Sequence, residues 1–167
     1  MTQTPTPAPT QPQIQVAVCG PSEATPEDEA HAREVGTLLA QRGAVVICGG
    51  GPGVMAAVAA GAKSVGGTVV GILPGRGRAG ANPDLSLTIS TGIGEARNAV
   101  IINSADAVIA VGGSWGTLSE IAFAVRHGSV PVLCLVGWRI HDSEGQLLPG
   151  PVYVETPEAA VTAALGS

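Results

Sequence analysis

The sequence predicts an α/β fold: a doubly wound, mostly parallel Rossmann-like sheet with helices on both faces. Three observations lead to this prediction. Runs of consecutive apolar residues alternate along the chain with helical segments, which is typical of parallel strands buried on both faces. Two of these runs end in glycine-rich turns that open directly onto helices. Aromatic residues make up only 2% of the chain, so Ala, Val, Leu and Ile must build the core, which favours helices packed closely on a sheet.

Three strands and two helices are expected in the first half of the chain. The strands are continuous apolar runs, at 16–20, 44–48 and 68–73. A helix is expected over 26–42, because Thr25 is a favourable N-cap and acidic residues at 27–29 occupy the first turn. After the second strand, glycines at 49–53 lead into a helix from 54 to about 65.

The second half continues this alternation after a glycine-rich loop at 74–83. Strands are expected at a short segment, two apolar runs and a short edge segment: 87–89, 107–111, 130–135 and 152–154. Helices are expected between and after them, at 93–104, 117–126 and 157–165. Residues 1–13 are rich in Pro, Thr and Gln and have nothing to bury, so we expect a disordered tail there and a single domain over 14–167.

Charge and hydropathy exclude several classes of protein. Eight basic and 13 acidic residues give a net charge of −5 without any basic run, so we expect no nucleic-acid partner. No apolar run approaches the roughly 20 residues that span a bilayer, and the first residues lack a secretory pattern. We therefore expect a cytoplasmic protein with no membrane contact.

Cysteine and histidine spacing argues against a metal site. Cys19, Cys48 and Cys134 each end an apolar run and show no C-x-x-C or Cys/His spacing, so buried reduced thiols are expected. The three histidines are scattered at His31, His127 and His141. This is not the spacing of metal ligands, and no metal is expected.

The two glycine-rich turns, at 49–53 and 112–116, are the candidate phosphate sites. Glycines let the backbone approach a ligand, and the free N–H groups and dipole of the following helix favour bound negative charge. Neither turn matches G-x-G-x-x-G or the Gly-Lys-Ser/Thr of a P-loop, which argues against an ordinary NAD or P-loop site. A nucleotide or another phosphorylated ligand remains. The alternative is that the glycines serve only tight packing of helix on strand.

Several segments together resemble the LOG-type proteins, once labelled lysine decarboxylases. The resemblance covers about residues 15–136 and rests on 49–55, Ala62, 72–74, Arg97 and the Gly-Ser-Trp-Gly-Thr-Leu-Ser-Glu stretch at 113–120. The segments 91–98 and 118–122 are most similar to the branch that includes molybdenum cofactor carrier proteins. The decarboxylase label does not fit, because Lys63, the only lysine available for a pyridoxal phosphate Schiff base, falls in the middle of a predicted helix.

The resemblance implies phosphoribohydrolase activity, which releases the base and ribose 5-phosphate from a nucleoside 5′-monophosphate. The motif of LOG enzymes is P-G-G-x-G-T-x-x-E, preceded by an arginine onto which Arg97 maps. Gly112 stands in place of the proline and Ser114 in place of the second glycine. The other motif positions match, at Gly113, Gly116, Thr117 and Glu120. The resemblance also implies a homodimer, for which the apolar residues at 101–102 and 121–125 are weak support because they suit the core equally well.

The residue types fit this chemistry independently. Breaking a ribosyl bond builds positive charge on the sugar, which a carboxylate stabilises while it activates water. Glu120 is the candidate for that role, and Arg97 is the candidate to hold the 5′-phosphate or an adjacent hydroxyl. The structural alternative is that Glu120 only complements the helix dipole and that Arg97 pairs with Glu120 or Glu95. Ser114 has no nearby His–Asp partner in the sequence, which argues against a serine nucleophile.

The predicted ligand contacts come from both turns and their surroundings: Gly49, Gly50, Gly51, Gly53, Met55, Asn98, Gly112, Gly113, Ser114, Trp115, Gly116 and Thr117. Trp115 is placed either to stack on a base or pterin or to form a dimer contact. Arg76 and Arg78 either clamp a second phosphate or are solvated, and Asn82 is a further candidate to line the site.

Two functions follow from these residues. The first is a homodimeric hydrolase of purine-type nucleoside monophosphates that requires no cofactor. The second is a non-catalytic protein that holds a nucleotide or the pterin of the molybdenum cofactor. A DNA-processing role ranks below both because of the acidic charge.

Overall fold

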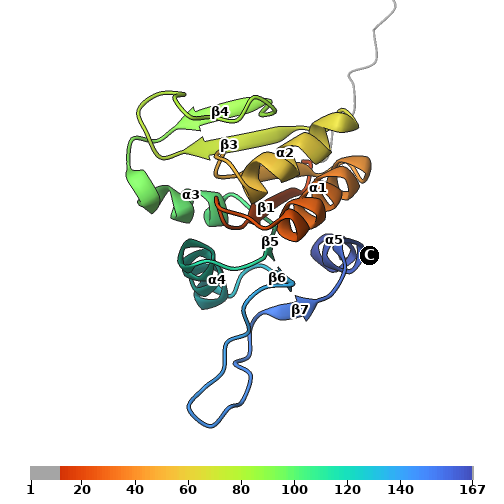
Figure 1. Ribbon diagram of the computed structural model, residues 1–167, viewed down its shortest axis with the longest axis vertical. Helices are drawn as coiled ribbons and strands as arrows, with labels where there is room; N and C mark the ends of the chain where they lie inside the picture. Colours follow the sequence, from red (N-terminus) through yellow and green to blue (C-terminus); the bar gives the residue numbers. More distant parts are fainter. Residues whose placement is uncertain (1–11, 167) are drawn as a thin grey trace, which may run out of the picture.

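The computed structural model describes residues 12–166, which form one seven-stranded sheet with helices on both faces (Figure 1). All six pairs of neighbouring strands are parallel. The sheet order is β4-β3-β2-β1-β5-β6-β7. The strands are β1 (Gln15–Cys19), β2 (Val45–Cys48), β3 (Val69–Leu73), β4 (Leu87–Ser90), β5 (Ala107–Val111), β6 (Val132–Leu135) and β7 (Val152–Val154). Most of the tail predicted at 1–13 lies outside the described residues.

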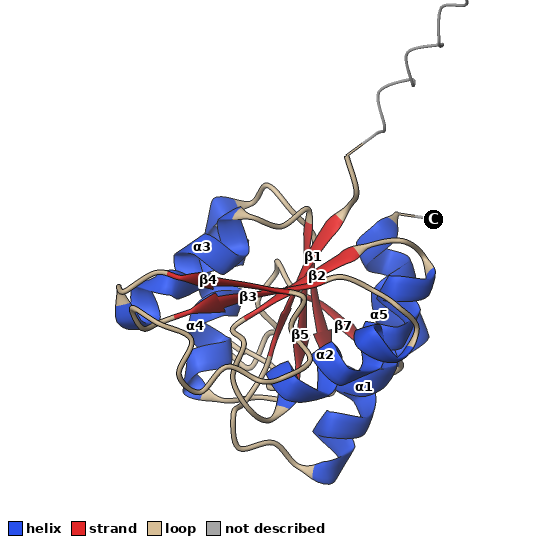
Figure 2. Ribbon diagram, turned by 90° about the horizontal axis from the view of Figure 1, so that it is seen from above, coloured by secondary structure: helices blue, strands red, loops and turns tan. Residues whose placement is uncertain are grey.

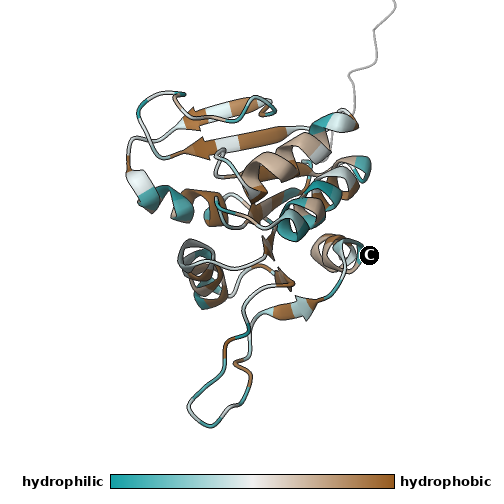
Figure 3. Ribbon diagram, in the orientation of Figure 1, coloured by the Kyte–Doolittle hydropathy of each residue, from teal (hydrophilic) through white to brown (hydrophobic). Residues whose placement is uncertain are grey.

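The helices form two layers, which confirms the predicted doubly wound fold (Figure 2). One layer holds α1 (Pro26–Gln41), α2 (Val54–Ser64) and α5 (Pro157–Leu165). The other holds the short 3₁₀ helix η1 (Gly94–Ala96), α3 (Arg97–Asn103) and α4 (Trp115–His127). The hydrophobic residues concentrate in the strands, whereas α1 carries many polar residues (Figure 3).

Helices α1 and α2 approach each other closely because two glycines lack side chains. A Cβ atom on Gly36 would collide with the carbonyl oxygen of Val58, and one on Gly61 would collide with that of Arg33. Small residues thus replace the aromatic residues that this core lacks, as the composition predicts.

The predicted elements are confirmed, with changes at their ends that have local causes. The helix predicted at 93–104 begins as η1 and becomes regular only at Arg97. The helix predicted at 117–126 begins at Trp115, because Ser114 is its N-cap. The strand predicted at 130–135 begins after Pro131, whose ring nitrogen has no N–H for the ladder.

The order of the strands places the ligand-binding edge of the sheet. Successive strands β1 to β4 run outward to one side, and the chain then returns to add β5 on the other side of β1. The C-terminal ends of β1 and β5 therefore flank a topological switch point, where ligands of open α/β sheets bind. Both glycine-rich turns lie at this edge, as predicted.

Several predictions about single residues are settled by burial. Ile101, Ile102 and Ile121 lie in the core between the sheet and helices α3 and α4, so the core alternative applies to them. The three cysteines are buried and form no disulfide bond, and burial raises the pKa of Cys48 and of Cys134 to about 11. Nowhere in residues 12–166 is there a helix with the length and apolar character that a membrane crossing requires.

Candidate functional site

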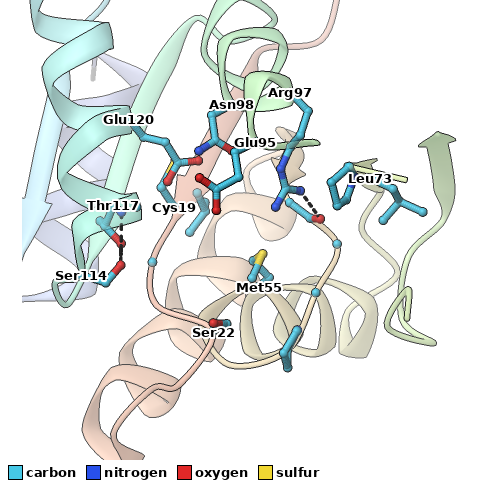
Figure 4. Close-up of a pocket in the computed structure, with 18 of the residues that line it drawn as sticks. Cys19, Ser22, Met55, Leu73, Glu95, Arg97, Asn98, Ser114, Thr117 and Glu120 are labelled. Carbon is cyan, nitrogen blue, oxygen red and sulfur yellow. Dashed lines mark hydrogen bonds between the residues drawn. The ribbon is translucent and has the colours of Figure 1, made fainter. Parts of the chain in front are cut away.

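A cavity of about 430 Å³ opens at the C-terminal edge of the sheet (Figure 4). Its walls come from the segments that follow β1, β2, β3 and β5 and from the start of α3. Ten of the predicted site residues line it: Gly49, Gly50, Gly51, Met55, Arg97, Asn98, Ser114, Gly116, Thr117 and Glu120. Predicted site residues as far apart in the sequence as Gly49 and Glu120 thus lie in the wall of one cavity. Their roles in binding and catalysis stay predictions.

Arg97 fastens the turn after β2 to the end of β3. The Nη1 atom of Arg97 donates hydrogen bonds to the carbonyl oxygens of Gly49 and Ile72, at the ends of β2 and β3. A Cβ atom on Gly49 would lie 2.6 Å from that Nη1, so glycine is what lets the guanidinium lie against the backbone. Arg97 therefore joins two strand ends at the wall of the cavity.

Asn82 supports the same turn from outside the cavity. Its backbone N–H donates to the carbonyl oxygen of Gly50 at 2.9 Å, and its side-chain Nδ2 donates to that of Gly51 at 3.3 Å. Asn82 is absent from the cavity wall, contrary to the expectation that it lines the site. Arg76 and Arg78 are exposed and also lie outside the wall, in agreement with the alternative of solvated charges.

The turn after β5 presents the start of α4 to the cavity. The hydroxyl oxygen of Ser114 accepts a hydrogen bond from the N–H of Thr117 at 3.2 Å, and the two hydroxyl oxygens lie 2.9 Å apart. Ser114 thus caps the helix, at the position where LOG enzymes carry a glycine. The N–H groups of Trp115 and Gly116 precede the helix's own hydrogen bonds and remain available to an anion.

Four predicted ligand contacts lie outside the cavity wall: Gly53, Gly112, Gly113 and Trp115. Backbone conformation and close contacts account for the glycines at these three positions. Gly53 and Gly112 have φ of +66° and +65°, and a Cβ atom on Gly112 would lie 2.6 Å from an oxygen of Asp28. Proline has a fixed negative φ, so this turn excludes the proline of the LOG motif. Gly113 lies under the indole of Trp138.

Glu120 is a buried acid in the wall of the cavity, with 8% of its surface exposed. Burial raises the pKa of its carboxyl group from 4.5 to about 7; hydrogen bonding from Cys19 and the charge of Arg97 oppose this shift, and the charge of Glu95 adds to it. The carboxyl groups of Glu120 and Glu95 lie beside Cys19 and Asn98 (Figure 4). Burial next to Glu120 also raises the pKa of the Cys19 thiol well above its usual range.

Arg97 is not paired with either acid. The ion pairs within residues 12–166 are Lys63–Asp84 and Arg139–Glu155, so the predicted alternative of an Arg97 ion pair is not found in this part of the chain. The Nε atom of Arg97 is buried without a hydrogen-bond partner. The structural alternative of a simple helix-dipole acid also fits Glu120 poorly, since Glu120 lies one turn inside α4 and is buried.

The sequence-based site omits the segment after β1. Cys19, Gly20 and Ser22 line the cavity, as do Glu95 and the segment at 73–74. The sequence did hold a signal for this segment. The apolar run of β1 is followed by a glycine, as are the runs before both predicted turns, and parallel strands have their C-terminal ends at one edge of the sheet. Within the described residues, no three His, Cys, Asp or Glu side chains gather where they could hold a metal ion.

Comparison with known proteins identifies the relatives of this chain. The model of the SLOG cluster4 family matches residues 13–161. A protein of uncharacterised function from Archaeoglobus fulgidus is 41% identical over 159 residues, which cover 92% of this chain and 96% of that protein.

Two solved structures share the fold along nearly the whole chain. The molybdenum cofactor binding protein of Rippkaea orientalis has a TM-score of 0.84 and 31% identity, covering 94% of this chain and 98% of its own. The molybdenum cofactor carrier protein of Chlamydomonas reinhardtii has a TM-score of 0.77 and 26% identity, covering 93% and 100%. The predicted resemblance to the carrier-like branch is thus confirmed.

Proposed function

The chain belongs to the SLOG cluster4 family, and from this premise we propose that its cavity binds a nucleoside 5′-monophosphate and hydrolyses the N-glycosidic bond. The observation that carries this proposal is Glu120, a carboxyl group buried in the cavity wall with its pKa raised to about 7. A general acid or base works best when its pKa lies near the working pH. A purely structural acid at a helix start has no need of such an environment.

The phosphate of the ligand binds where the backbone offers donors. The first N–H groups of α4 point out of the helix start, and the glycine turn after β2 lets a ligand approach the backbone. Arg97 contributes its positive charge and holds this turn in place through Gly49 and Ile72. In this proposal Arg97 is first a positioning residue, and its remaining donors serve the ligand.

Glu120 acts on the sugar. In its ionised form the carboxylate stabilises the positive charge that develops on the ribose as the C1′–N bond breaks, and it accepts a proton from the attacking water. The hydroxyl oxygen forms the new bond to C1′, the electron pair of the broken bond leaves with the base, and the base takes up the proton that Glu120 accepted. Ribose 5-phosphate and the free base are the products.

Incubation with AMP and related monophosphates, with release of base and ribose 5-phosphate followed over time, tests the activity. We expect release by the native protein, none by Glu120→Ala, and unchanged release by Glu158→Ala, which alters an exposed helical glutamate in α5. Binding of AMP to the Glu120→Ala protein should persist. If that variant loses affinity while its bound fraction still turns over, the catalytic role of Glu120 is refuted.

A second candidate function is carriage of the molybdenum cofactor without cleavage. Two observations favour it: the similarity to the Rippkaea and Chlamydomonas proteins, and the departures from the LOG motif at Gly112 and Ser114. The same glycine turns would then hold the phosphate of the pterin as cargo. Saturable binding of the cofactor, measured by retained molybdenum after gel filtration, together with no release of base from any monophosphate, would establish this function instead.

We further propose that the protein acts as a homodimer in the cytoplasm and has no nucleic-acid partner. The dimer is expected from the family, and the net charge of −5 opposes binding to a phosphate backbone. Light scattering at micromolar concentration should give twice the mass of the 16.5 kDa chain. The mass of a monomer would contradict the proposed dimer. Salt-sensitive binding to DNA would contradict the absence of a nucleic-acid partner.

A further inference from the structure

Both tryptophans of the chain lie together beside the turn that follows β5, a turn that forms part of the cavity wall. Trp115 is the first residue of α4, between Ser114 and Gly116, which line the cavity. It is 79% exposed, more than any other large hydrophobic residue in the described part of the chain. Its ring meets that of Trp138 edge to face, with centroids 5.1 Å apart and planes at 80°. At least one face of Trp115 is therefore open to solvent.

Trp138 is held in place by contacts that leave no room for side chains beneath it. A Cβ atom on Gly113 would lie 2.6 Å from the indole Nε1, so this indole lies directly on the Gly113 backbone. A Cβ atom on Gly137 would lie 2.5 Å from the carbonyl oxygen of Gly112. The segment that follows β6 is thus pressed onto the turn that follows β5.

The backbone before Trp138 is strained. Val136 has φ of +51°, and it is the one non-glycine residue with positive φ among those described. A β-branched residue adopts this region only at an energetic cost, and such strain gathers at functional sites. Here the strained residue turns the chain out of β6 so that Trp138 meets Trp115. From Trp138 the chain continues into the long loop that extends away from the sheet (Figure 1).

We propose that Trp115 and Trp138 form an aromatic platform that receives the flat heteroaromatic ring of the ligand while its phosphate is held in the cavity. Trp115 supplies the stacking face, and Trp138 is a positioning residue that fixes its orientation. Indole rings stack on purines and pterins alike, because every such ring has a π-face. This inference rests on the proposed function and defines the ligand as a phosphorylated compound that carries a flat ring.

Three probes separate the ring from the phosphate: AMP, neopterin monophosphate and ribose 5-phosphate, which has no ring. Trp115→Ala should weaken binding of the first two between about 5- and 150-fold, the range for one stacked base, and leave binding of ribose 5-phosphate unchanged. Trp115→Phe should restore most of the affinity. Leu87→Ala, which removes another exposed apolar side chain far along the sheet on β4, should change none of the three affinities.

Tryptophan fluorescence gives a second measurement, because ligand binding would not change the emission of Trp115 if its role were only structural. In Trp138→Phe, Trp115 is the only tryptophan left, since the chain has two. We expect AMP or neopterin monophosphate to quench its emission at saturation and ribose 5-phosphate to leave it unchanged.

Distinct results overturn the platform and the proposed function. Equal affinity of the native and Trp115→Ala proteins for a ring-bearing probe overturns the platform and leaves the proposed function standing. So does a change of oligomeric state in Trp115→Ala with unaltered affinities, which would make the pair a contact with a second copy. Absence of saturable binding of both ring-bearing probes to the native protein overturns both proposals.

Discussion

Replacing Glu120 with glutamine should change how the stability of the protein depends on pH. In the folded protein the carboxyl group of Glu120 has a pKa of about 7, against 4.5 for an exposed glutamate, and burial is the main cause. Between these two values the folded chain keeps a proton that the unfolded chain releases. The free energy of unfolding therefore falls as the pH rises through this window.

The size of the effect follows from the shift. One unit of pKa corresponds to about 1.4 kcal/mol, so this shift costs the native protein about 3 kcal/mol of stability once the pH exceeds 7. Glutamine is uncharged and has nearly the same shape, so Glu120→Gln escapes that cost. The difference in stability between the variant and the native protein should thus grow in favour of the variant by ~2–3 kcal/mol from pH 5 to pH 8.

Urea unfolding followed by far-ultraviolet circular dichroism measures this difference. With a typical slope of ~2 kcal/mol per molar urea, the gap between the two midpoints should widen by about 1 M over the pH range. Glu158→Gln is the control, because Glu158 is an exposed glutamate in the first turn of α5. A gap for Glu120→Gln that stays the same at pH 5 and pH 8 would refute the argument that Glu120 is buried at a cost.

Three further substitutions test other parts of the structure. Arg97→Ala leaves the carbonyl oxygens of Gly49 and Ile72 without their donor, so it should lower the free energy of unfolding in urea by ~2–4 kcal/mol and weaken the binding of AMP. Equal stability of the variant and the native protein would contradict the role of Arg97 in joining the two strand ends. Gly61→Ala places a methyl group against the backbone of α1 and should lower the free energy of unfolding by ~1–3 kcal/mol. The control is Gly77→Ala, whose methyl group would meet nothing within 4 Å and should leave stability unchanged. Equal urea midpoints for the two variants would argue against the close approach of α1 and α2. Ser114→Ala should cost about 1 kcal/mol through loss of the α4 cap and Ser114→Gly only a few tenths, and a thermal scan in which both lose equally would count against capping.

The fold was predictable because every strand in the middle of the sheet is buried on both faces. Strands β1, β5 and β6 expose almost nothing, so their sequences are uninterrupted apolar runs that stand out from the helices. The edge strand β4 is mostly exposed and gave a weaker signal. The boundary errors arise where one residue decides the end of an element, as Ser114 and Pro131 do.

Much of the site was predictable for a related reason. Glycine turns after strands are local features, and the parallel topology carries them to one edge of the sheet. The partners of Arg97 are not local: Gly49 and Ile72 precede it by 48 and 25 residues, and only the order of β2 and β3 in the sheet brings them together. The contact of Trp138 with Gly113 likewise depends on the pairing of β5 with β6.

The position of Arg97 bears on how the two candidate functions are related. A guanidinium that joins the ends of β2 and β3 builds the cavity wall whether the ligand is cleaved or only held, so loss of Arg97 would damage a hydrolase and a carrier alike. Glu120 differs, because neither glycine turn is hydrogen-bonded to its side chain and because burial of its carboxyl group costs stability. The proposed hydrolysis depends on a carboxyl group that titrates near the working pH, whereas holding a ligand without cleavage does not require one. The Glu120 variants, rather than those of Arg97, therefore decide between the two functions.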